Sequence, residues 1–351
     1  MKKFIPLLCL LFSIGGFAQT DVSAYVPGKN TDAVTYFLPK TAIEVEITTT
    51  KVKYTPGEFS KYADRYLRLN NISDKPDEYW EISDMKVTST GIPDPSQGYS
   101  IKLKDKTVAP LVELTEEGII LSINKPAEKK AAAKADETSI PQKPRLNARD
   151  FMTEEILLAS SSAKMAELVA KEIYNIRESK NAIIRGQADN MPQDGAAIKI
   201  MLSSLEEQEQ AMMEMFTGVT ETETKKFSLR MIPSKEVGEE VLFRFSRKLG
   251  VLDKDDLGGS PVYFTLTDLQ TVPPVDENAK KNKVEGVVYN VPGNGQIKIF
   301  NNAKTFFEGT FAIAQFGNQE VLANNLFNKK NTTQVSFDPK TGGIVKIDRS
   351  E

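Results

Sequence analysis

The chain has 351 residues, 40% of them hydrophobic and 26% charged, a balance typical of folded, water-soluble protein in one or two domains. A net charge of −3 gives no electrostatic basis for binding nucleic acid. The sequence contains no histidine and one cysteine, Cys9, so it excludes a histidine general base and a zinc site built from histidine and cysteine ligands.

Residues 1–18 have the pattern of a signal peptide. Lys2 and Lys3 precede an apolar run over 4–12, and small residues come just before Gln19. The run is shorter than the ~20 residues that a transmembrane helix needs, and no later stretch is predicted to span a membrane. We therefore expect export to the periplasm, the outer membrane or the cell exterior. Removal of the two lysines would take the net charge from −3 to −5.

The part from 19 to 123 is predicted to be a β-rich domain with one short helix. Six segments are rich in β-forming residues or alternate apolar with polar residues, as strands do: 34–38, 42–50, 81–88, 99–103, 111–114 and 119–123. Pro39 is expected to separate the first two strands, and the Pro93-Asp94-Pro95 run to form a loop between the next two. Trp80, the only tryptophan, is expected to be a core residue.

A capping-box pattern at Thr55-Pro56-Gly57-Glu58 predicts the start of that helix. Tyr62 and Tyr66 would lie on one side of it, and Arg65 would lie nearby on the other. The two tyrosines either pack the helix against a sheet, with their hydroxyls at the rim, or form a platform for a sugar or peptide. We take Tyr62, Tyr66 and Arg65 as the candidate binding residues, and we assign no catalytic residue.

Two acidic groups raise the question of catalysis or metal binding. Glu44 and Glu46 would share one face of a strand, where a carboxylate pair could act as acid and base, although a solvated strand face is the more common arrangement. The run from Asp253 to Gly258 resembles the start of a calcium loop, but Leu257 and Phe264 occupy positions that need ligands. We therefore predict no metal site and no cofactor.

Residues 124–146 are dominated by Ala, Lys, Glu and Pro, which predicts a flexible linker or loop. Residues 147–218 then predict an antiparallel helical hairpin, because two apolar stripes at helical spacing are joined by a short break. Thr153 would begin the first helix, Asp194 lies near the start of the second, and Gly218 ends it. The stripes are Ile156, Leu158, Met165, Val169, Ile173 and Ile176, and then Ile198, Met201, Leu202, Leu205, Met212, Met215 and Phe216.

The part from 219 to 351 is predicted to be an antiparallel β domain. Its strand segments are 226–231, 241–245, 262–266, 284–291, 296–300, 304–315, 334–337 and 344–347. Pro292-Gly293-Asn294-Gly295 and Lys340-Thr341-Gly342-Gly343 are expected to be hairpin turns. The sequence therefore predicts an α+β fold, in which antiparallel β-rich N- and C-terminal parts, sandwich- or barrel-like, flank a central helical hairpin.

Short segments that span nearly the whole chain after residue 18 carry a family resemblance. They are Tyr36-Phe37-Leu38-Pro39-Lys40-Thr41, Pro56 to Leu69, Pro93-Asp94-Pro95, Asp194-Gly195, Phe216-Thr217-Gly218, Ile313 to Gly317 and Asp338 to Gly342. Together they resemble a family of exported Bacteroidetes proteins known as domain of unknown function 4831. The resemblance implies an exported or envelope location, and it implies nothing about chemistry.

Three functions remain open from the sequence. The first is a non-catalytic cell-envelope protein that binds a protein or glycan partner. The second is a histidine-free hydrolase, such as a glycosidase, whose two carboxyl groups would lie roughly 5–10 Å apart in a cleft. The third is a calcium-stabilised surface protein. The sequence contains no phosphate-binding loop, dinucleotide fingerprint or serine-nucleophile elbow that would point to other enzymes.

Overall fold

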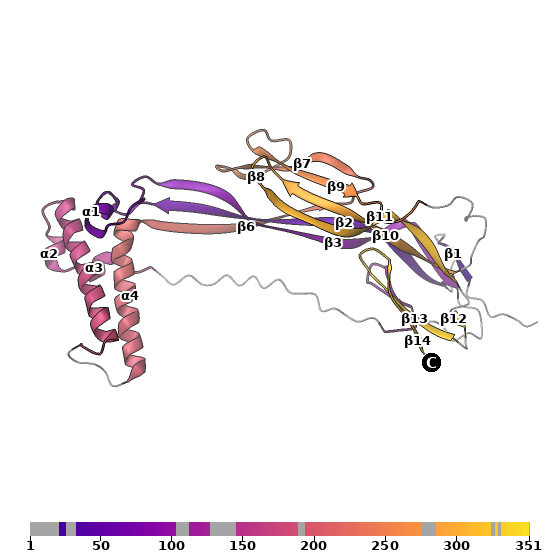
Figure 1. Ribbon diagram of the computed structural model, residues 1–351, viewed down its shortest axis with the longest axis horizontal. Helices are drawn as coiled ribbons and strands as arrows, with labels where there is room; N and C mark the ends of the chain where they lie inside the picture. The colour runs from indigo at the N-terminus through magenta and orange to yellow at the C-terminus, as the bar shows by residue number, and fades with distance from the viewer. Residues whose placement is uncertain are drawn as a thin grey trace, which may run out of the picture.

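The computed structural model describes residues 21–25, 33–102, 112–126, 145–188, 194–274, 286–323, 327–328 and 331–350. The predicted signal peptide and most of the predicted linker, residues 127–144, lie outside the described residues. The molecule is a long rod, with helices at one end and β-strands along the rest (Figure 1). No described helix is long and apolar enough to cross a membrane.

The strands and helices follow one another along the chain in the order of their numbers. The strands are β1 (Asp21–Ala24), β2 (Ala33–Thr55), β3 (Asp77–Lys102), β4 (Val112–Leu114), β5 (Ile120–Ile123), β6 (Val219–Met231), β7 (Val237–Ser246), β8 (Gly250–Leu252), β9 (Ser260–Asp268), β10 (Gly286–Phe300), β11 (Thr305–Ala323), β12 (Phe327–Asn328), β13 (Asn331–Phe337) and β14 (Ile344–Ser350). The helices are η1 (Ser60–Tyr62), α1 (Ala63–Leu67), η2 (Ala148–Phe151), α2 (Glu154–Leu157), α3 (Ser162–Ile184) and α4 (Gly195–Thr217).

Three sheets form the β part, and all pairs between their strands are antiparallel in the described chain. The long sheet has the order β1-β3-β2-β6, and the covering sheet has the order β11-β10-β9-β7-β8. The end sheet has the order β12-β13-β5-β4, with β14 paired to β13. Segments from before and after the helices share sheets, because β6 pairs with β2 and β5 pairs with β13. The predicted α+β, β-rich fold class is confirmed.

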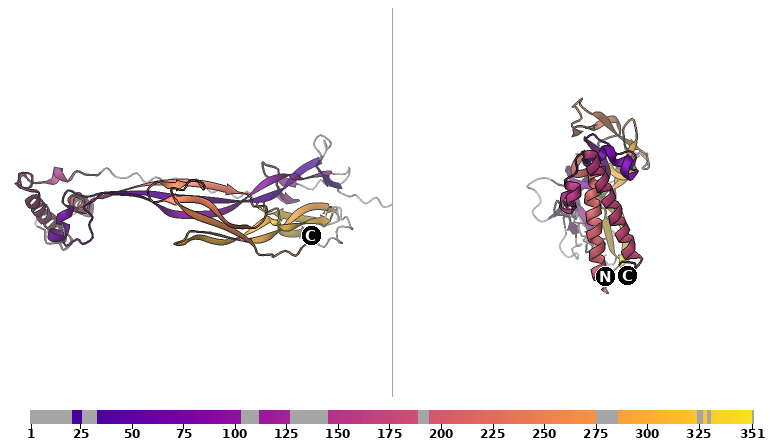
Figure 2. Two further views of the ribbon diagram at one scale, coloured as in Figure 1. Left: turned by 90° about the horizontal axis from the view of Figure 1, so that it is seen from above. Right: turned by 90° about the vertical axis from the view of Figure 1, so that its left-hand side faces the viewer.

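The long and covering sheets pack face to face as a sandwich, seen edge-on in the left view of Figure 2. Ile43, Val45 and Ile47 of β2 are fully buried, while Glu44 and Glu46 between them point to the opposite face. This alternation is the normal consequence of the two-residue period of a strand. The covering sheet supplies the facing residues of the core: Phe243, Val262, Phe264, Leu266, Ile297, Ile299 and Ile313.

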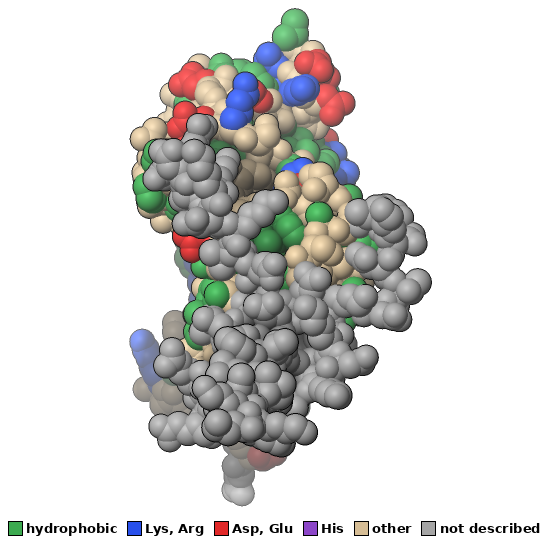
Figure 3. All heavy atoms as spheres, turned by 90° about the vertical axis from the view of Figure 1, so that its right-hand side faces the viewer, with side chains coloured by type: hydrophobic (Ala, Val, Ile, Leu, Met, Phe, Trp, Pro, Cys, Tyr) green, Lys and Arg blue, Asp and Glu red, His purple; other side chains and the backbone are tan. Residues whose placement is uncertain are grey.

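A second core lies at the end of the rod opposite the helices. Tyr36 and Leu38 at the start of β2 pack there with Ile120 of β5 and with Val335 and Phe337 of β13. Figure 3 looks along the rod from this end: charged side chains gather at the top of the view, and hydrophobic side chains show below them. The two cores are consecutive along β2, so one strand belongs to both.

β2 and β3 correct the strand prediction, because each is one unbroken strand of 23 and 26 residues. No loop forms at Pro93–Pro95, and Pro39 does not separate two strands. Pro39 lies directly opposite Pro93 at a shift in the register of the β2–β3 pair. Proline is tolerated in a strand at such an irregularity, because its missing N–H is then not required by the ladder.

β10 corrects the hairpin predicted at residues 292–295, since it runs straight through them and pairs with β11 on both sides. A bulge between Val291 and Gly293 accommodates the proline between them. The glycines serve close packing and not a turn. A Cβ on Gly293 would lie 2.3 Å from the carbonyl oxygen of Phe316, so only glycine permits this approach. The other predicted hairpin, between β13 and β14, is confirmed.

The helical head, which we define as η1, α1, η2, α2, α3 and α4, forms the other end of the rod. α3 and α4 lie side by side in the right view of Figure 2, and their shared core includes Ile173, Met212 and Phe216. Asp194 caps α4 by accepting a hydrogen bond from the Ala196 amide, and Gly218 follows its last residue with a positive φ of 73°. α4 then continues directly into β6 (Figure 1).

Parts of the helical prediction need correction. The first helix is interrupted: α2 is a separate turn, and α3 begins at Ser162, where Ser161 accepts a hydrogen bond from the Lys164 amide. Leu158 lies in this interruption and is 73% exposed, and Met201 is also exposed.

The helix expected from Thr55 begins later, because Thr55 still belongs to β2 and the first helical turn starts at Ser60. Gly57 instead permits a close approach to α4, since a Cβ there would lie 2.2 Å from the carbonyl oxygen of Met215. Trp80 is half-buried outside the three buried cores. Its ring packs over Gly250 and has the amino group of Lys225 5.1 Å from its centroid.

Candidate functional site

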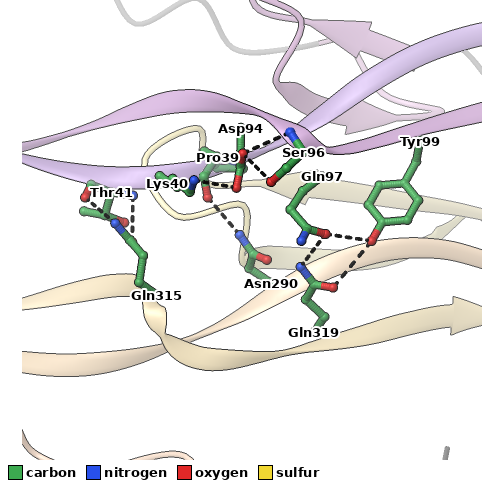
Figure 4. A network of polar contacts seen from close by, with 10 residues as sticks. All are labelled: Pro39, Lys40, Thr41, Asp94, Ser96, Gln97, Tyr99, Asn290, Gln315 and Gln319. Carbon is green, nitrogen blue, oxygen red and sulfur yellow. Dashed lines mark hydrogen bonds and ion pairs between the residues drawn. The ribbon is translucent and has the colours of Figure 1, made fainter. Parts of the chain in front are cut away.

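Polar side chains gather where the long sheet, the covering sheet and the β13–β14 turn meet (Figure 4). They surround a small hollow of about 130 Å³, which we call the junction pocket. Its lining residues are Leu38, Pro39, Lys40, Asp94, Gln97, Asn290, Ala314, Gln315 and Gln319. The register shifts of the β2–β3 and β10–β11 pairs lie beside this pocket, and the extra residues, 94–97 of β3 and 314–317 of β11, include four of its lining residues.

Thr41, which is fully buried, ties three segments together. Its amide donates to Oε1 of Gln315 at 2.9 Å, and Nε2 of Gln315 donates to the Thr41 carbonyl at 2.9 Å. Its hydroxyl donates to the Lys340 carbonyl at 3.1 Å and accepts from the Ala314 amide at 3.0 Å. The side chain of Gln315 thus replaces the strand partner that Thr41 lacks on this side of β2, because the pairing with β6 ends at Ile43.

Asn290 is 5% exposed, and its hydrogen bonds fix the orientation of its amide. Nδ2 donates to the carbonyls of Pro39 at 3.1 Å and Thr341 at 2.8 Å, so both of its hydrogens are used. The amide oxygen must then point the other way, and Figure 4 shows it on the side toward Gln97 and Gln319. Within the part of the chain that the structure describes, this oxygen accepts no hydrogen bond.

Gln97 is held on the opposite wall. Its Oε1 accepts hydrogen bonds from the Tyr99 hydroxyl and from Nε2 of Gln319, both at 3.2 Å. Its Nε2 has no acceptor among the described residues and also borders the pocket. The pocket wall therefore offers one oriented acceptor, on Asn290, and one oriented donor, on Gln97.

Asp94 is buried and lies in an ion pair with Lys40, whose Nζ is 2.9 Å from Oδ2. Oδ1 accepts from the Ser96 amide at 3.1 Å and from the Ser96 hydroxyl at 2.7 Å. Burial opposes ionisation, but the hydrogen bonds from Ser96 and the contact with Lys40 outweigh it and lower the pKa of Asp94 below its usual value. Asp94 is therefore a charged, fully engaged carboxylate.

The structure places the sequence-predicted residues Tyr62, Tyr66 and Arg65 on the helical head, which follows the C-terminal end of β2, whereas the junction pocket lies near the start of that strand. The tyrosine rings are 6.1 Å apart, and the Arg65 guanidinium lies 5.3 Å from the Tyr66 ring. The Tyr66 hydroxyl donates to the Ala163 carbonyl, which ties η1 and α1 to α3. A shallow hollow beside α1 is lined by Lys61, Asp64 and neighbouring residues, but none of these three residues lines it.

The acidic groups singled out in the sequence have basic or backbone partners. Nε of Arg230 donates to Glu44 at 2.9 Å, and Lys226 lies 3.7 Å from Glu46. Asp253 and Asp256 form a turn that is closed by a hydrogen bond from the Asp256 amide to the Asp253 carbonyl. Within the described ranges, no three acidic residues form a group that could hold a metal ion.

Sequence reasoning did not find the junction pocket. Four of the segments that carry the family resemblance meet there: Tyr36 to Thr41, Pro93 to Pro95, Ile313 to Gly317 and Asp338 to Gly342. The first two segments lie more than 200 residues before the last two, and each one alone is interpreted as a turn, a loop or a strand. The signal in the sequence that could have indicated the pocket is that all four segments belong to the set that carries the family resemblance.

The fold and the junction define an elongated, β-rich α+β protein with a helical head. A family model described as a domain of unknown function (DUF4831) matches residues 32–345, so the chain belongs to that family. Neither the comparison with curated proteins nor the comparison with solved structures gives a match.

Proposed function

We propose that this is an exported, non-catalytic protein of the cell envelope that binds a protein or glycan partner. The supporting observation is the rod itself, which holds the helical head at one end and the junction pocket far along the same two strands (Figure 1). β2 alone spans about 75 Å at ~3.3 Å per residue. Such a shape presents two separated surfaces to partners.

The position of the polar groups also favours binding over catalysis. Glu44 and Glu46 each have a basic partner, and Asp94 is the one carboxylate among the residues that line the junction pocket. A glycosidase requires two convergent carboxyl groups. At the junction, the side chains of Thr41, Gln315 and Asn290 instead hold backbone groups of neighbouring strands.

Site-directed photo-cross-linking in the native cells tests the proposal. A photoreactive residue would replace Arg65 on the head or Lys40 at the junction, and Lys86, exposed on the outer face of β3, would serve as the matched control. We expect a discrete cross-linked envelope component from Arg65 or Lys40 and none from Lys86. Equal labelling from all three positions, or none from any, would overturn the binding role.

Export and the absence of turnover need separate measurements. The intact mass of the protein recovered from the envelope fraction should correspond to an N-terminus at Gln19. The purified protein should show no turnover of glycosides, peptides or esters between about pH 5 and 8. A bell-shaped rate profile with an acidic limb would instead indicate a working carboxylate and would restore the hydrolase hypothesis.

A further inference from the structure

We propose that the junction pocket binds a hydroxyl-bearing ligand, the edge of one sugar residue. The inference rests on the binding role proposed above and names the chemistry of one site. Its basis is the pair of unused polar atoms in the pocket wall, Oδ1 of Asn290 and Nε2 of Gln97.

Asn290 carries the argument furthest, because its side chain is held by the surrounding strands while its amide oxygen is open to the pocket and accepts no hydrogen bond from a described residue. An amide oxygen that is open to a pocket is hydrogen-bonded to water until a donor group of a ligand replaces that water. The two carbonyls that accept from Nδ2 hold the side-chain amide in one orientation, so its oxygen cannot rotate away from the pocket. The oxygen therefore faces the pocket as a preformed acceptor.

The two free atoms also select the ligand chemistry. Oδ1 of Asn290 requires a donor and Nε2 of Gln97 requires an acceptor, and one hydroxyl group is both at once. An anion would meet the Asn290 oxygen and the Asp94 carboxylate, while a cation would meet the Gln97 amide hydrogens and Lys40. A neutral hydroxyl can donate to the Asn290 oxygen and accept from the Gln97 amide, and neither Asp94 nor Lys40 repels it.

The size and lining of the pocket fit this class. A volume of 130 Å³ is close to the ~150 Å³ of a cavity that holds one benzene molecule, so the pocket admits part of a sugar ring and not a folded peptide. Leu38, Pro39 and Ala314 give it an apolar side, against which the C–H groups of a sugar can lie. Lys40, which is about half exposed, borders the pocket and leaves it open toward solvent.

NMR titration of the full chain tests the inference. The probes are the methyl glycosides of glucose, galactose, mannose and N-acetylglucosamine, with sodium acetate and acetamide as charged and amide competitors. We expect at least one glycoside, and neither competitor, to shift the side-chain amide signals of Asn290 and Gln97. Gln97→Ala should weaken that binding about tenfold. Gln296→Ala, an exposed glutamine on the covering sheet, should leave it unchanged.

Each alternative outcome is decisive. If no glycoside shifts these signals, the pocket holds ordered water only and the inference is wrong. A shift by acetamide or acetate alone would identify a different ligand class, and equal binding by Gln97→Ala would place the sugar elsewhere. Cross-links from the head without glycoside binding would leave the binding role standing and reject only the sugar site.

Discussion

At the scale of single residues, Asn290 both stabilises the fold and lines the junction pocket. Asn290→Ala removes the donors for the buried carbonyls of Pro39 and Thr341. We expect a loss of about 1–3 kcal/mol in the free energy of unfolding, measured by urea denaturation. Asn302→Ala, at an exposed position after β10, should stay within about 0.5 kcal/mol. Similar losses in both variants would mean that the Asn290 bonds contribute little.

Asp94 predicts an acid-sensitive contribution to stability. Because the folded state lowers its pKa, the carboxylate stabilises the protein above the unfolded pKa of about 3.9, and this contribution is lost as the pH falls through the lower folded value. Asp94→Asn should therefore destabilise the protein at neutral pH, and the difference from the unmodified protein should shrink in strong acid. Urea melts over a pH series measure this difference, and Asp255→Asn in an exposed turn is the matched control. A constant difference across pH would contradict the assignment.

At the scale of elements, two methionines of α4 test how the helical head is held together. Met212 is 1% exposed in the core of the head, whereas Met201, three turns earlier, is 37% exposed. Met212→Ala should cost about 2–5 kcal/mol through lost burial and the cavity left behind. Met201→Ala should cost less than about 1 kcal/mol. Denaturation followed by helical circular dichroism would show the contrast, and equal costs would mean that the packed part of α4 extends as far as Met201.

The helices were predictable because their signals are local. The apolar spacing of α3 and α4, the Asp194 cap and the Gly218 terminus all lie within one or two turns of the residues that they organise. The exposed positions Leu158 and Met201 could not be identified in this way. Which part of an apolar stripe is covered depends on where η1 and α1 pack, and those segments come from elsewhere in the chain.

The strands show why local signals fail in the β part. Pro39 suggests a strand end, and its tolerance depends on Pro93, more than fifty residues away, lying directly opposite. Gly293 and Gly295 suggest a turn, yet Gly293 is required by the close approach of the β11 backbone, and Gly295 leaves room for the side chains of Ile313 and Leu266. The junction pocket is the extreme case, because Asn290 and Gln97 become neighbours only through the assembled sheets.

At the scale of the whole molecule, the rod predicts its behaviour in solution. A compact chain of this length would have a radius of gyration of about 20 Å. Small-angle X-ray scattering should give a clearly larger value, with a distance distribution skewed toward long distances as for a cylinder. A value near 20 Å with a symmetric distribution would mean that the helical head folds back onto the sheets.

The unbroken course of β2 and β3 has a mechanical consequence. A pull between the helical head and the opposite end would run along two covalent backbones, without crossing an interface between separate domains. β6, which continues from α4, is aligned with them over thirteen residue pairs, from Val219 opposite Thr55 to Met231 opposite Ile43. Tension on α4 would load the β2–β6 pairing in shear. The hydrogen bonds between these two strands would then resist together instead of opening one after another. The rod would thus resist being stretched between its two ends.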